Sequence, residues 1–289
     1  MVSFKEQWLE AVERKNSVLC VGLDPADFEM NRPGETLKEG ENKLTWTLKL
    51  VEAVAPYCAA VKPNTQYWKG PLDRLYMVEV AKLADSLGLV LIEDAKLADI
   101  GDTNESGIFH PSRQKIDAVT LAPYAGNMKQ AADQCKKWGV GGITMCLMSN
   151  PEYKREKNKL VPVSGEEDTY DSTDILRLED VPYVRQFVQL AHDAALYGIE
   201  GLVIGAPSKN NHIQEEEIAL ARRYGGVERM VLLPGVGKQG GEAGAIWKHF
   251  DPSYVVVNVG RTVMFPEDQD QATAARHYQT MLNELRRAA

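Results

Sequence analysis

Residues that build metal centres and disulfide frameworks are scarce in this sequence. Its 289 residues include four cysteines and five histidines, and none of them forms a CxxC, HxH or HExxH pattern. Three of the cysteines lie in or beside apolar runs, which is typical of reduced core thiols in a cytoplasmic protein. We therefore expect neither a disulfide framework nor a metal site.

Long apolar runs and an excess of basic residues are also missing. No run approaches the roughly 18 apolar residues that a membrane-spanning helix needs. Residues 1–14 are amphipathic and include acids, unlike a secretory signal peptide. The net charge is −8, whereas general nucleic-acid binding favours a basic face. These features argue against membrane insertion and nucleic-acid binding, but a small anionic ligand needs only local positive charge.

Common nucleotide-binding and nucleophile motifs do not occur either. The sequence contains no P-loop and no GxSxG turn. The first apolar run leads into Val21-Gly22-Leu23-Asp24-Pro25, where a doubly wound open sheet would usually carry a glycine-rich GxGxxG turn. This absence disfavours the open sheet as the arrangement of strands.

Short apolar runs rich in β-branched residues recur eight times, with helical periodicity between them. Continuous hydrophobic runs are expected of parallel strands that are buried on both faces. Eight such strands alternating with helices over about 250 residues predict an α/β fold, a (β/α)8 TIM barrel, as a single domain over residues 1–289. The expected strands are 17–24, 59–65, 89–96, 118–123, 142–149, 201–206, 230–235 and 254–260, and the clearest helices are 44–54, 72–86, 128–138, 184–197 and 213–224.

Two segments interrupt this repeat. Residues 26–42 are polar and contain Gly and Pro, which predicts a long loop after the first strand. Residues 150–182 are charged and lack apolar periodicity, and they fall between the fifth strand and its helix. We expect a long loop or lid insertion at about 150–182, with a tolerated surface insertion as the equal alternative.

The decapeptide 94–103 (DAKLADIGDT) is the most informative segment of the chain. Asp94 and Lys96 are two residues apart, so on a strand their side chains point the same way, and Asp99 follows in the next loop. Core packing does not explain these charges, because unpaired buried charges are costly. Flanking acids keep a lysine protonated, which indicates a proton donor, although a surface ion pair explains the segment alone equally well.

Polar residues gather at the carboxyl ends of the predicted strands, where barrels place their active sites. Chance or simple solvation would distribute them over both ends. The residues at this end are Asp24, Lys62, Asn64, Asp94, Lys96, Asp99, Ser149 and Asn150, together with those that follow the last two strands.

The loops after the last two strands predict a phosphate site, as is common in barrels. Residues 234–241 (PGVGKQGG) begin at Pro234 and Gly235, and their glycines let backbone N–H groups approach an anion. Gln239 adds an amide donor, and Arg261 after Gly260 offers a bidentate fork. A glycine-rich segment alone slightly favours a flexible turn, but the neighbouring arginine favours phosphate.

These motifs resemble the orotidine 5′-phosphate decarboxylase family, and the resemblance covers nearly the whole chain. The length and the Lys62-Pro63-Asn64 segment are similar to the longer bacterial-type branch of that family. The resemblance implies a homodimeric barrel that converts orotidine 5′-monophosphate to UMP and CO2 in pyrimidine synthesis, without a cofactor or metal. The motifs that carry it are Leu23-Asp24, Val61-Lys62, Asp94-x-Lys96-x-x-Asp99-Ile100-Gly101-x-Thr103, Ser149, the 234–241 run and Gly260-Arg261.

The resemblance also implies a role for each of these residues. Lys62, Asp94, Lys96 and Asp99 would form an alternating charge array, with Lys96 as proton donor to the C6 carbanion. Segment 150–182 departs from the family pattern, so contacts beyond Ser149 are hard to align. Asp24 and Lys62 would contact ribose hydroxyls, and Ser149 would contact the pyrimidine. The phosphate would be bound by Pro234, Gly235, Gln239, Gly260 and Arg261. Asp99, Ile100 and Thr103 would reach the site of the partner subunit.

Two alternatives stay open. Mg²⁺-dependent sugar-phosphate decarboxylases and synthases of the same superfamily resemble this chain in the Asp-x-Lys-x-x-Asp run, but they place a metal-binding acid where Lys62 stands. A lysine at that position would repel the cation. A non-catalytic nucleotide-binding barrel is the other alternative, and the complete set of charged positions argues against it.

Overall fold

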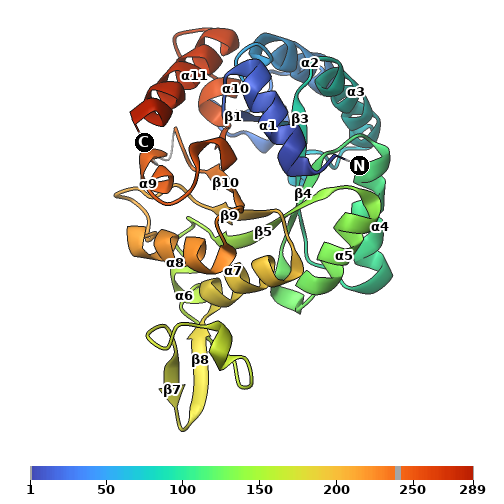
Figure 1. Cartoon of the computed structure of the whole chain (residues 1–289). Helices are drawn as coiled ribbons and strands as arrows, with labels where there is room; N and C mark the ends of the chain where they lie inside the picture. The colour runs from blue at the N-terminus through green and yellow to red at the C-terminus, as the bar shows by residue number, and fades with distance from the viewer. Residues whose placement is uncertain (1, 238–241, 289) are drawn as a thin grey trace.

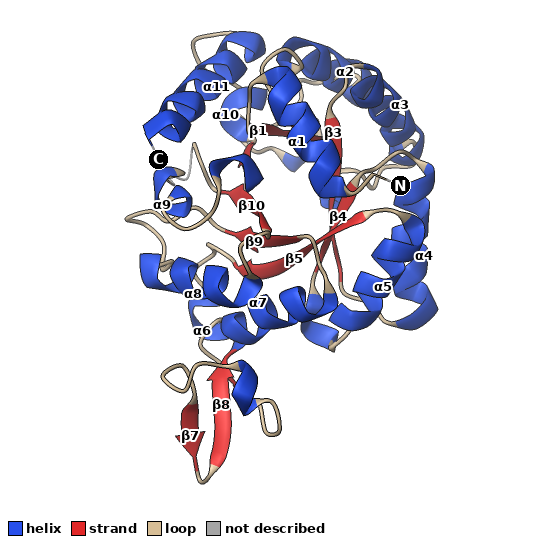
Figure 2. Ribbon diagram, in the orientation of Figure 1, coloured by secondary structure: helices blue, strands red, loops and turns tan. Residues whose placement is uncertain are grey.

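The eight short apolar runs form the strands of a closed parallel barrel. In the computed structural model, which describes residues 2–237 and 242–288, consecutive barrel strands are hydrogen-bonded neighbours and the last pairs with the first (Figure 2). The predicted (β/α)8 barrel is therefore confirmed. Its strands are β1 (Leu19–Gly22), β2 (Ala60–Lys62), β3 (Val90–Leu97), β4 (Ala118–Leu121), β5 (Gly141–Leu147), β9 (Gly201–Ile204), β10 (Met230–Pro234) and β11 (Val255–Val259).

Burial on both faces explains why these runs are continuously apolar. Every residue of β1, β2, β4, β5 and β9 is buried, because alternate side chains fill the barrel interior or pack under the surrounding helices. The exceptions lie toward the carboxyl ends of the other three strands: β3, where exposure begins at Glu93, β10 at Pro234 and β11 at Asn258. That end of the barrel is therefore where charged side chains become accessible.

Helices surround the barrel, and the five predicted ones are confirmed to within two residues at their ends (Figure 1). Residues 184 and 185, predicted to begin a helix, instead end a strand. The longer helices are α1 (Phe4–Lys15), α2 (Lys43–Val54), α3 (Asp73–Ser86), α4 (Gly101–Arg113), α5 (Met128–Trp138), α7 (Gln186–Tyr197), α8 (Glu215–Gly225) and α11 (Gln271–Ala288), and the shorter ones are α6 (Tyr153–Glu156), α9 (Gly244–Trp247) and α10 (Arg261–Met264).

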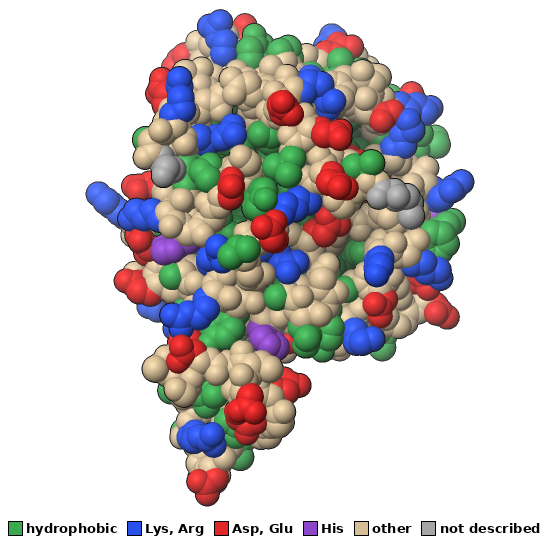
Figure 3. Space-filling view, viewed as in Figure 1, with side chains coloured by type: hydrophobic (Ala, Val, Ile, Leu, Met, Phe, Trp, Pro, Cys, Tyr) green, Lys and Arg blue, Asp and Glu red, His purple; other side chains and the backbone are tan. Residues whose placement is uncertain are grey.

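Helix α1 packs against the amino-terminal end of the barrel. The indole N–H of Trp8 donates to the carbonyl of Ser253, just before β11, over 2.7 Å. A Cβ on Gly141, at the start of β5, would lie 2.4 Å from the Cβ of Phe4, so close packing of α1 requires glycine there. Figure 3 shows acidic and basic side chains interspersed on the face that carries α1. The opposite end of the barrel is thus left for the strand-end residues.

The segment predicted as a long loop or lid at about 150–182 contains a small antiparallel sheet. Strands β6 (Leu160–Pro162), β8 (Val181–Arg185) and β7 (Leu176–Leu178) pair antiparallel in that order. Glu179 and Asp180 join β7 to β8 with φ of 49° and 68°, as in the two-residue turns whose twist suits a hairpin. In Figure 1 this sheet projects beyond the ring of helices and does not lie across the barrel opening.

A period-two pattern explains the sheet. Pro182 and Val184 are buried, whereas Val181, Tyr183 and Arg185 between them are half-buried, so one face of β8 packs inward. The surrounding charges obscure this short alternation in the sequence. Residues 26–42, by contrast, form the predicted loop, with a single short 3-10 helix at Phe28–Met30. Among the helices that the structure describes, none is long and apolar enough to cross a membrane.

Candidate active site

Three of the predicted charged residues meet at the carboxyl ends of β2 and β3. The carboxylate of Asp94 accepts from Lys62 Nζ through Oδ2 over 2.8 Å and from Lys96 Nζ through Oδ1 over 2.6 Å. The Lys62 side chain is only 4% exposed, whereas that of Lys96 is 45% exposed. One buried and one accessible ammonium group therefore flank a single carboxylate.

Their ion pair keeps Asp94 and Lys62 charged. Burial by itself would raise the pKa of Asp94, but Lys62 and Lys96 outweigh it and hold that pKa well below its usual range. Burial would likewise lower the pKa of Lys62, but the negative charges of Asp94 and Asp24 outweigh it and raise that pKa. At neutral pH, Asp94 is therefore an anion and Lys62 a cation.

A β-bulge aims the side chains of this array. Between Glu93 and Leu97 the register of β3 shifts against β4, so that three residues of β3 face Thr120 alone. Lys96 has a φ of 49°, a left-handed conformation that is uncommon outside glycine. Asp94 and Lys96 do approach each other, but through this bulge and not through the regular strand alternation that we predicted.

Thr120, which the sequence analysis missed, holds the bulge in place. Its hydroxyl donates to Asp94 Oδ1 and accepts from the backbone N–H of Lys96, each over 2.9 Å. Thr120 is fully buried near the end of β4, between Val119 and Leu121. A hydroxyl in such an apolar run needs a partner, and this signal could have identified the residue.

Asp24, just beyond β1, joins the array to a cavity of about 320 Å³. Its Oδ1 accepts from the backbone N–H of Asn64 over 2.9 Å. Burial raises the pKa of Asp24, although the positive charge of Lys62 and the Asn64 N–H oppose the shift. The same cavity is lined by Pro234, Gly235, Gly260 and Arg261, so Asp24 lies beside the described residues that were predicted to bind phosphate.

The guanidinium of Arg261, which we predicted to bind phosphate, forms an ion pair within the chain. Arg261 begins α10 directly after Gly260, and its Nη1 donates to Glu35 Oε1 over 2.6 Å. Glu35 belongs to the loop between β1 and α2, and it was not predicted as a site residue. Gln239, predicted to add a phosphate donor, lies outside the described residues.

Ser149 lies two residues beyond β5, at the same end of the barrel. A Cβ on Gly205 would lie 2.7 Å from the Cβ of Ser149, so the glycine after β9 permits the two loops to pack closely. His212 Nε2 donates to the carbonyl of Asn150 over 2.9 Å and further ties these loops together. Among the described residues no hydrogen bond links Ser149 to Lys62, Asp94 or Lys96.

Asp99, Ile100 and Thr103 do not join the array of their own chain. Asp99 is exposed; its Oδ1 accepts from the backbone N–H of Ile100 over 2.9 Å, and its carbonyl accepts from Asn127 over 2.6 Å. Ile100 is 59% exposed. Among the described residues no hydrogen bond or ion pair links Asp99 to Lys96, so the four-residue array is not assembled within one chain.

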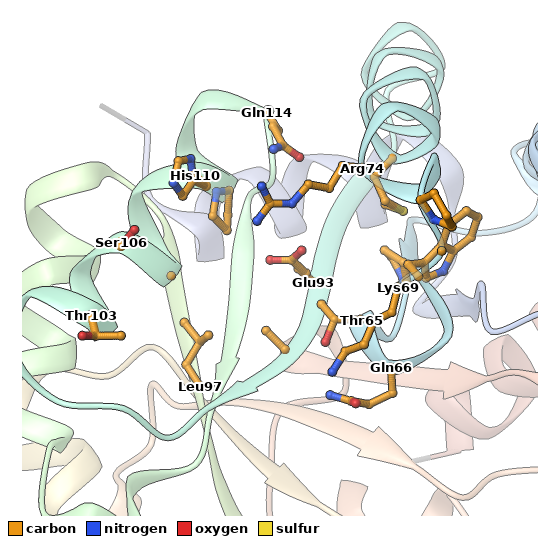
Figure 4. Close-up of a pocket in the computed structure, with 18 residues that line it drawn as sticks. Thr65, Gln66, Lys69, Arg74, Glu93, Leu97, Thr103, Ser106, His110 and Gln114 are labelled. Carbon is orange, nitrogen blue, oxygen red and sulfur yellow. The ribbon is translucent and has the colours of Figure 1, made fainter.

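A larger cavity, of about 830 Å³, lies on the outer face of β3 between α3 and α4 (Figure 4). Glu93 from β3 lies deep in it, Arg74 of α3 points toward Glu93, and Thr103 and His110 line it from α4. Burial raises the pKa of Glu93 to about 7. Since successive residues of a strand alternate between faces, this cavity is separate from the interior site of Asp94.

The described residues contain no cluster of typical metal ligands. Across residues 2–237 and 242–288 no group of three or more His, Cys, Asp or Glu side chains is arranged to hold a metal ion. At the end of β2, the ammonium group of Lys62 would repel a cation. The site is thus built from fixed charges and hydrogen-bond donors.

The fold and the site define a (β/α)8 barrel with an ammonium–carboxylate array beside a cavity that Arg261 lines. The family model described as orotidine 5′-phosphate decarboxylase / HUMPS family matches residues 17–278. The chain belongs to this family.

Similar proteins cover almost the full length of the chain. A protein of Polaromonas naphthalenivorans named orotidine 5′-phosphate decarboxylase is 31% identical, with 97% of this chain and 94% of that protein covered. One of the same name from Methylibium petroleiphilum is 30% identical, with 95% of each covered. The solved structure of a putative orotidine-monophosphate-decarboxylase from Toxoplasma gondii has a TM-score of 0.79 at 21% identity, over 99% of this chain and 97% of that one. This last likeness supports the fold.

We expect Glu93→Gln to raise the melting temperature clearly at pH 8 and only slightly at pH 5. Burial raises the pKa of Glu93 to about 7, above its unfolded value, so wild-type stability falls as the pH rises between the two values. Removing the charge should stabilise the protein at pH 8 by roughly 2 kcal/mol. Thermal unfolding at both pH values measures this, with the exposed Glu52→Gln as control. Equal shifts at both pH values would contradict the burial of an ionised Glu93.

Proposed function

We propose that this protein decarboxylates orotidine 5′-monophosphate to UMP and CO2, in the synthesis of pyrimidine nucleotides. The observation that carries the proposal is Asp94 held between Lys62 and Lys96 beside a cavity that contains Arg261. Membership of the decarboxylase family and the names of its relatives support it.

Lys96 is the proton donor in this proposal. Loss of CO2 leaves the electron pair of the broken bond on C6, with no attached cofactor to delocalise it. An ammonium group beside C6 stabilises this charge as it develops and then transfers a proton to carbon. Lys96 suits the role better than Lys62, because its side chain is 45% exposed whereas that of Lys62 is 4% exposed.

The other residues orient the substrate and maintain the charges. Asp94 lies near the departing carboxylate and keeps both lysines in place. Binding of the phosphate, remote from C6, supplies interaction energy that orders the reacting end of the substrate. In this arrangement Asp24 and Lys62 contact ribose hydroxyls, and Ser149 contacts the pyrimidine. The phosphate is bound by Arg261, Gln239 and the backbone at Pro234, Gly235 and Gly260.

The functional unit in this proposal is a cytoplasmic homodimer. Asp99, Ile100 and Thr103 extend from one subunit into the site of the other and complete the array there. Three observations support this: Asp99 makes no bond to its own Lys96, Ile100 is 59% exposed, and Thr103 faces an outer cavity. The buried, unpaired thiols of all four cysteines are consistent with a reducing compartment.

Orotidine 5′-monophosphate tests the reaction directly. We expect a rapid change in ultraviolet absorbance, with UMP as product, when the purified protein meets this substrate in the presence of EDTA. Activity that EDTA abolishes, or activity only on sugar phosphates with Mg²⁺, would favour the metal-dependent enzymes of the superfamily and would reject the role given to Lys62.

Lys96→Ala is expected to lower turnover by about 10³-fold or more, because it removes both the charge beside C6 and the proton source. The fold should persist, since the side chain is 45% exposed. Lys115→Ala is a matched control: Lys115 also has a positive φ, 57°, but lies on the surface away from the site. Steady-state kinetics and melting temperature provide the readouts. A merely twofold loss for Lys96→Ala would remove Lys96 from the role of proton donor.

Mixing Lys96→Ala with Asp99→Ala chains tests the shared site. Each variant alone should be nearly inactive. Random subunit exchange should restore about a quarter of wild-type activity, because half the dimers are hybrids with one intact site. Exchange can be verified with differently tagged chains. If exchange is complete and activity does not recover, Asp99 acts within its own subunit.

A further inference from the structure

The ion pair between Arg261 and Glu35 places a carboxylate where the proposed site must bind phosphate. Arg261 Nη1 and Glu35 Oε1 are 2.6 Å apart, and their side chains are 39% and 18% exposed. The two residues are 226 positions apart in the sequence, yet both line the cavity of about 320 Å³ that also contains Asp24. The acid therefore reaches the arginine from a different loop.

Backbone hydrogen bonds hold the Glu35 loop against the barrel. The carbonyl of Glu35 accepts from the N–H of Ala26 over 3.2 Å, and the carbonyl of Ala26 accepts from the N–H of Leu37 over 2.9 Å. Ala26 lies two residues after Asp24, so this pairing positions Glu35 relative to the end of β1. These bonds place the main chain of Glu35 close to Arg261.

A second arginine of the same loop lines the same cavity. Arg32 lies three residues before Glu35, and its carbonyl accepts from the N–H of Glu35 over 3.0 Å. Its Nη1 donates to the hydroxyl of Tyr67 over 2.6 Å, and its guanidinium lies 5.5 Å from the centre of that ring. When Glu35 is displaced, the cavity retains two guanidinium groups, Arg32 and Arg261, for an incoming anion.

A carboxylate and a phosphate compete for the same donors of an arginine. Both accept the paired N–H bonds of the guanidinium fork, but a phosphate monoester carries a charge of about −1.5 to −2 at neutral pH and offers three acceptor oxygens. A carboxylate carries a single charge. A phosphate monoester can therefore displace Glu35 from Arg261, whereas a neutral ligand has no means to do so.

We propose that Glu35 determines the anion specificity of this site: it pairs with Arg261 in the ligand-free enzyme and gives way to the phosphate of the substrate, with Arg32 as the second phosphate-binding cation. The proposal rests on the proposed function for the identity of the phosphate-bearing ligand. Because Glu35 must be displaced, it weakens the binding of phosphate-bearing ligands and leaves the binding of a nucleoside unaffected. Release of product also benefits, since the carboxylate returns to Arg261.

Binding of UMP and uridine to Glu35→Gln, measured by calorimetry, tests the exchange. We expect Glu35→Gln to bind UMP about tenfold more tightly than wild type and to bind uridine equally well. Glu39→Gln, an exposed acid of the same loop, should change neither affinity. When Arg261→Ala is already present, adding Glu35→Gln should no longer change the affinity for UMP. Arg32→Ala alone should weaken the binding of UMP but not that of uridine.

Two outcomes would overturn the proposal. If Glu35→Gln weakens the binding of UMP, as Arg261→Ala does, then Glu35 orients the arginine and does not compete with phosphate. If the affinities for UMP and uridine change equally, the substitution does not act on the binding of the phosphate. Failure of the proposed function is distinguishable, because wild type would then not decarboxylate orotidine 5′-monophosphate, and a site for sugar phosphates would bind neither UMP nor uridine. In that case the affinity of the same variants for ribose 5-phosphate would be measured. Tighter binding of ribose 5-phosphate by Glu35→Gln supports the exchange, and unchanged binding rejects it.

Discussion

The site depends on mutual charge compensation around one buried carboxylate. An isolated acid or lysine at the end of β2 or β3 would lose its charge on burial, because the low-dielectric surroundings favour the neutral form. Asp94 escapes this only because Lys62 and Lys96 bind its two oxygens. The barrel makes the arrangement possible, since parallel neighbouring strands bring their carboxyl ends, and with them these three side chains, to one place.

Backbone irregularity gives the array its geometry. In a regular strand, the pleat alone would set the directions of the Asp94 and Lys96 side chains. The bulge opposite Thr120 instead places Lys96 in a left-handed backbone conformation. Such conformations persist only where surrounding bonds impose them, and the two hydrogen bonds of Thr120 supply that constraint. The accessible lysine is therefore held by its main chain as well as by its ion pair.

The barrel and the gathering of polar residues at its strand ends could be predicted from the sequence because both leave local patterns. Burial on two faces produces continuous apolar runs, and a charged residue after such a run marks a strand end. The bulge could not be predicted, because it depends on the register of β3 against β4. Nor could the contact of Glu35 with Arg261, which joins loops 226 residues apart, or the small sheet, whose brief alternation is hidden among charges. The positions of Asp99 and Ile100 relative to a complete site depend on a second chain.

The sheet of β6, β7 and β8 has a consequence for how this chain can vary over evolution. It leaves the barrel after β5 and returns at α7, and the buried ion pair of Lys157 with Glu217 secures its base to α8. Because the entropic cost of a connection grows only with the logarithm of its length, residues can be added or lost beyond that ion pair at little cost to the barrel. The protein can thus acquire or discard surface there while the chemistry at the strand ends stays constant.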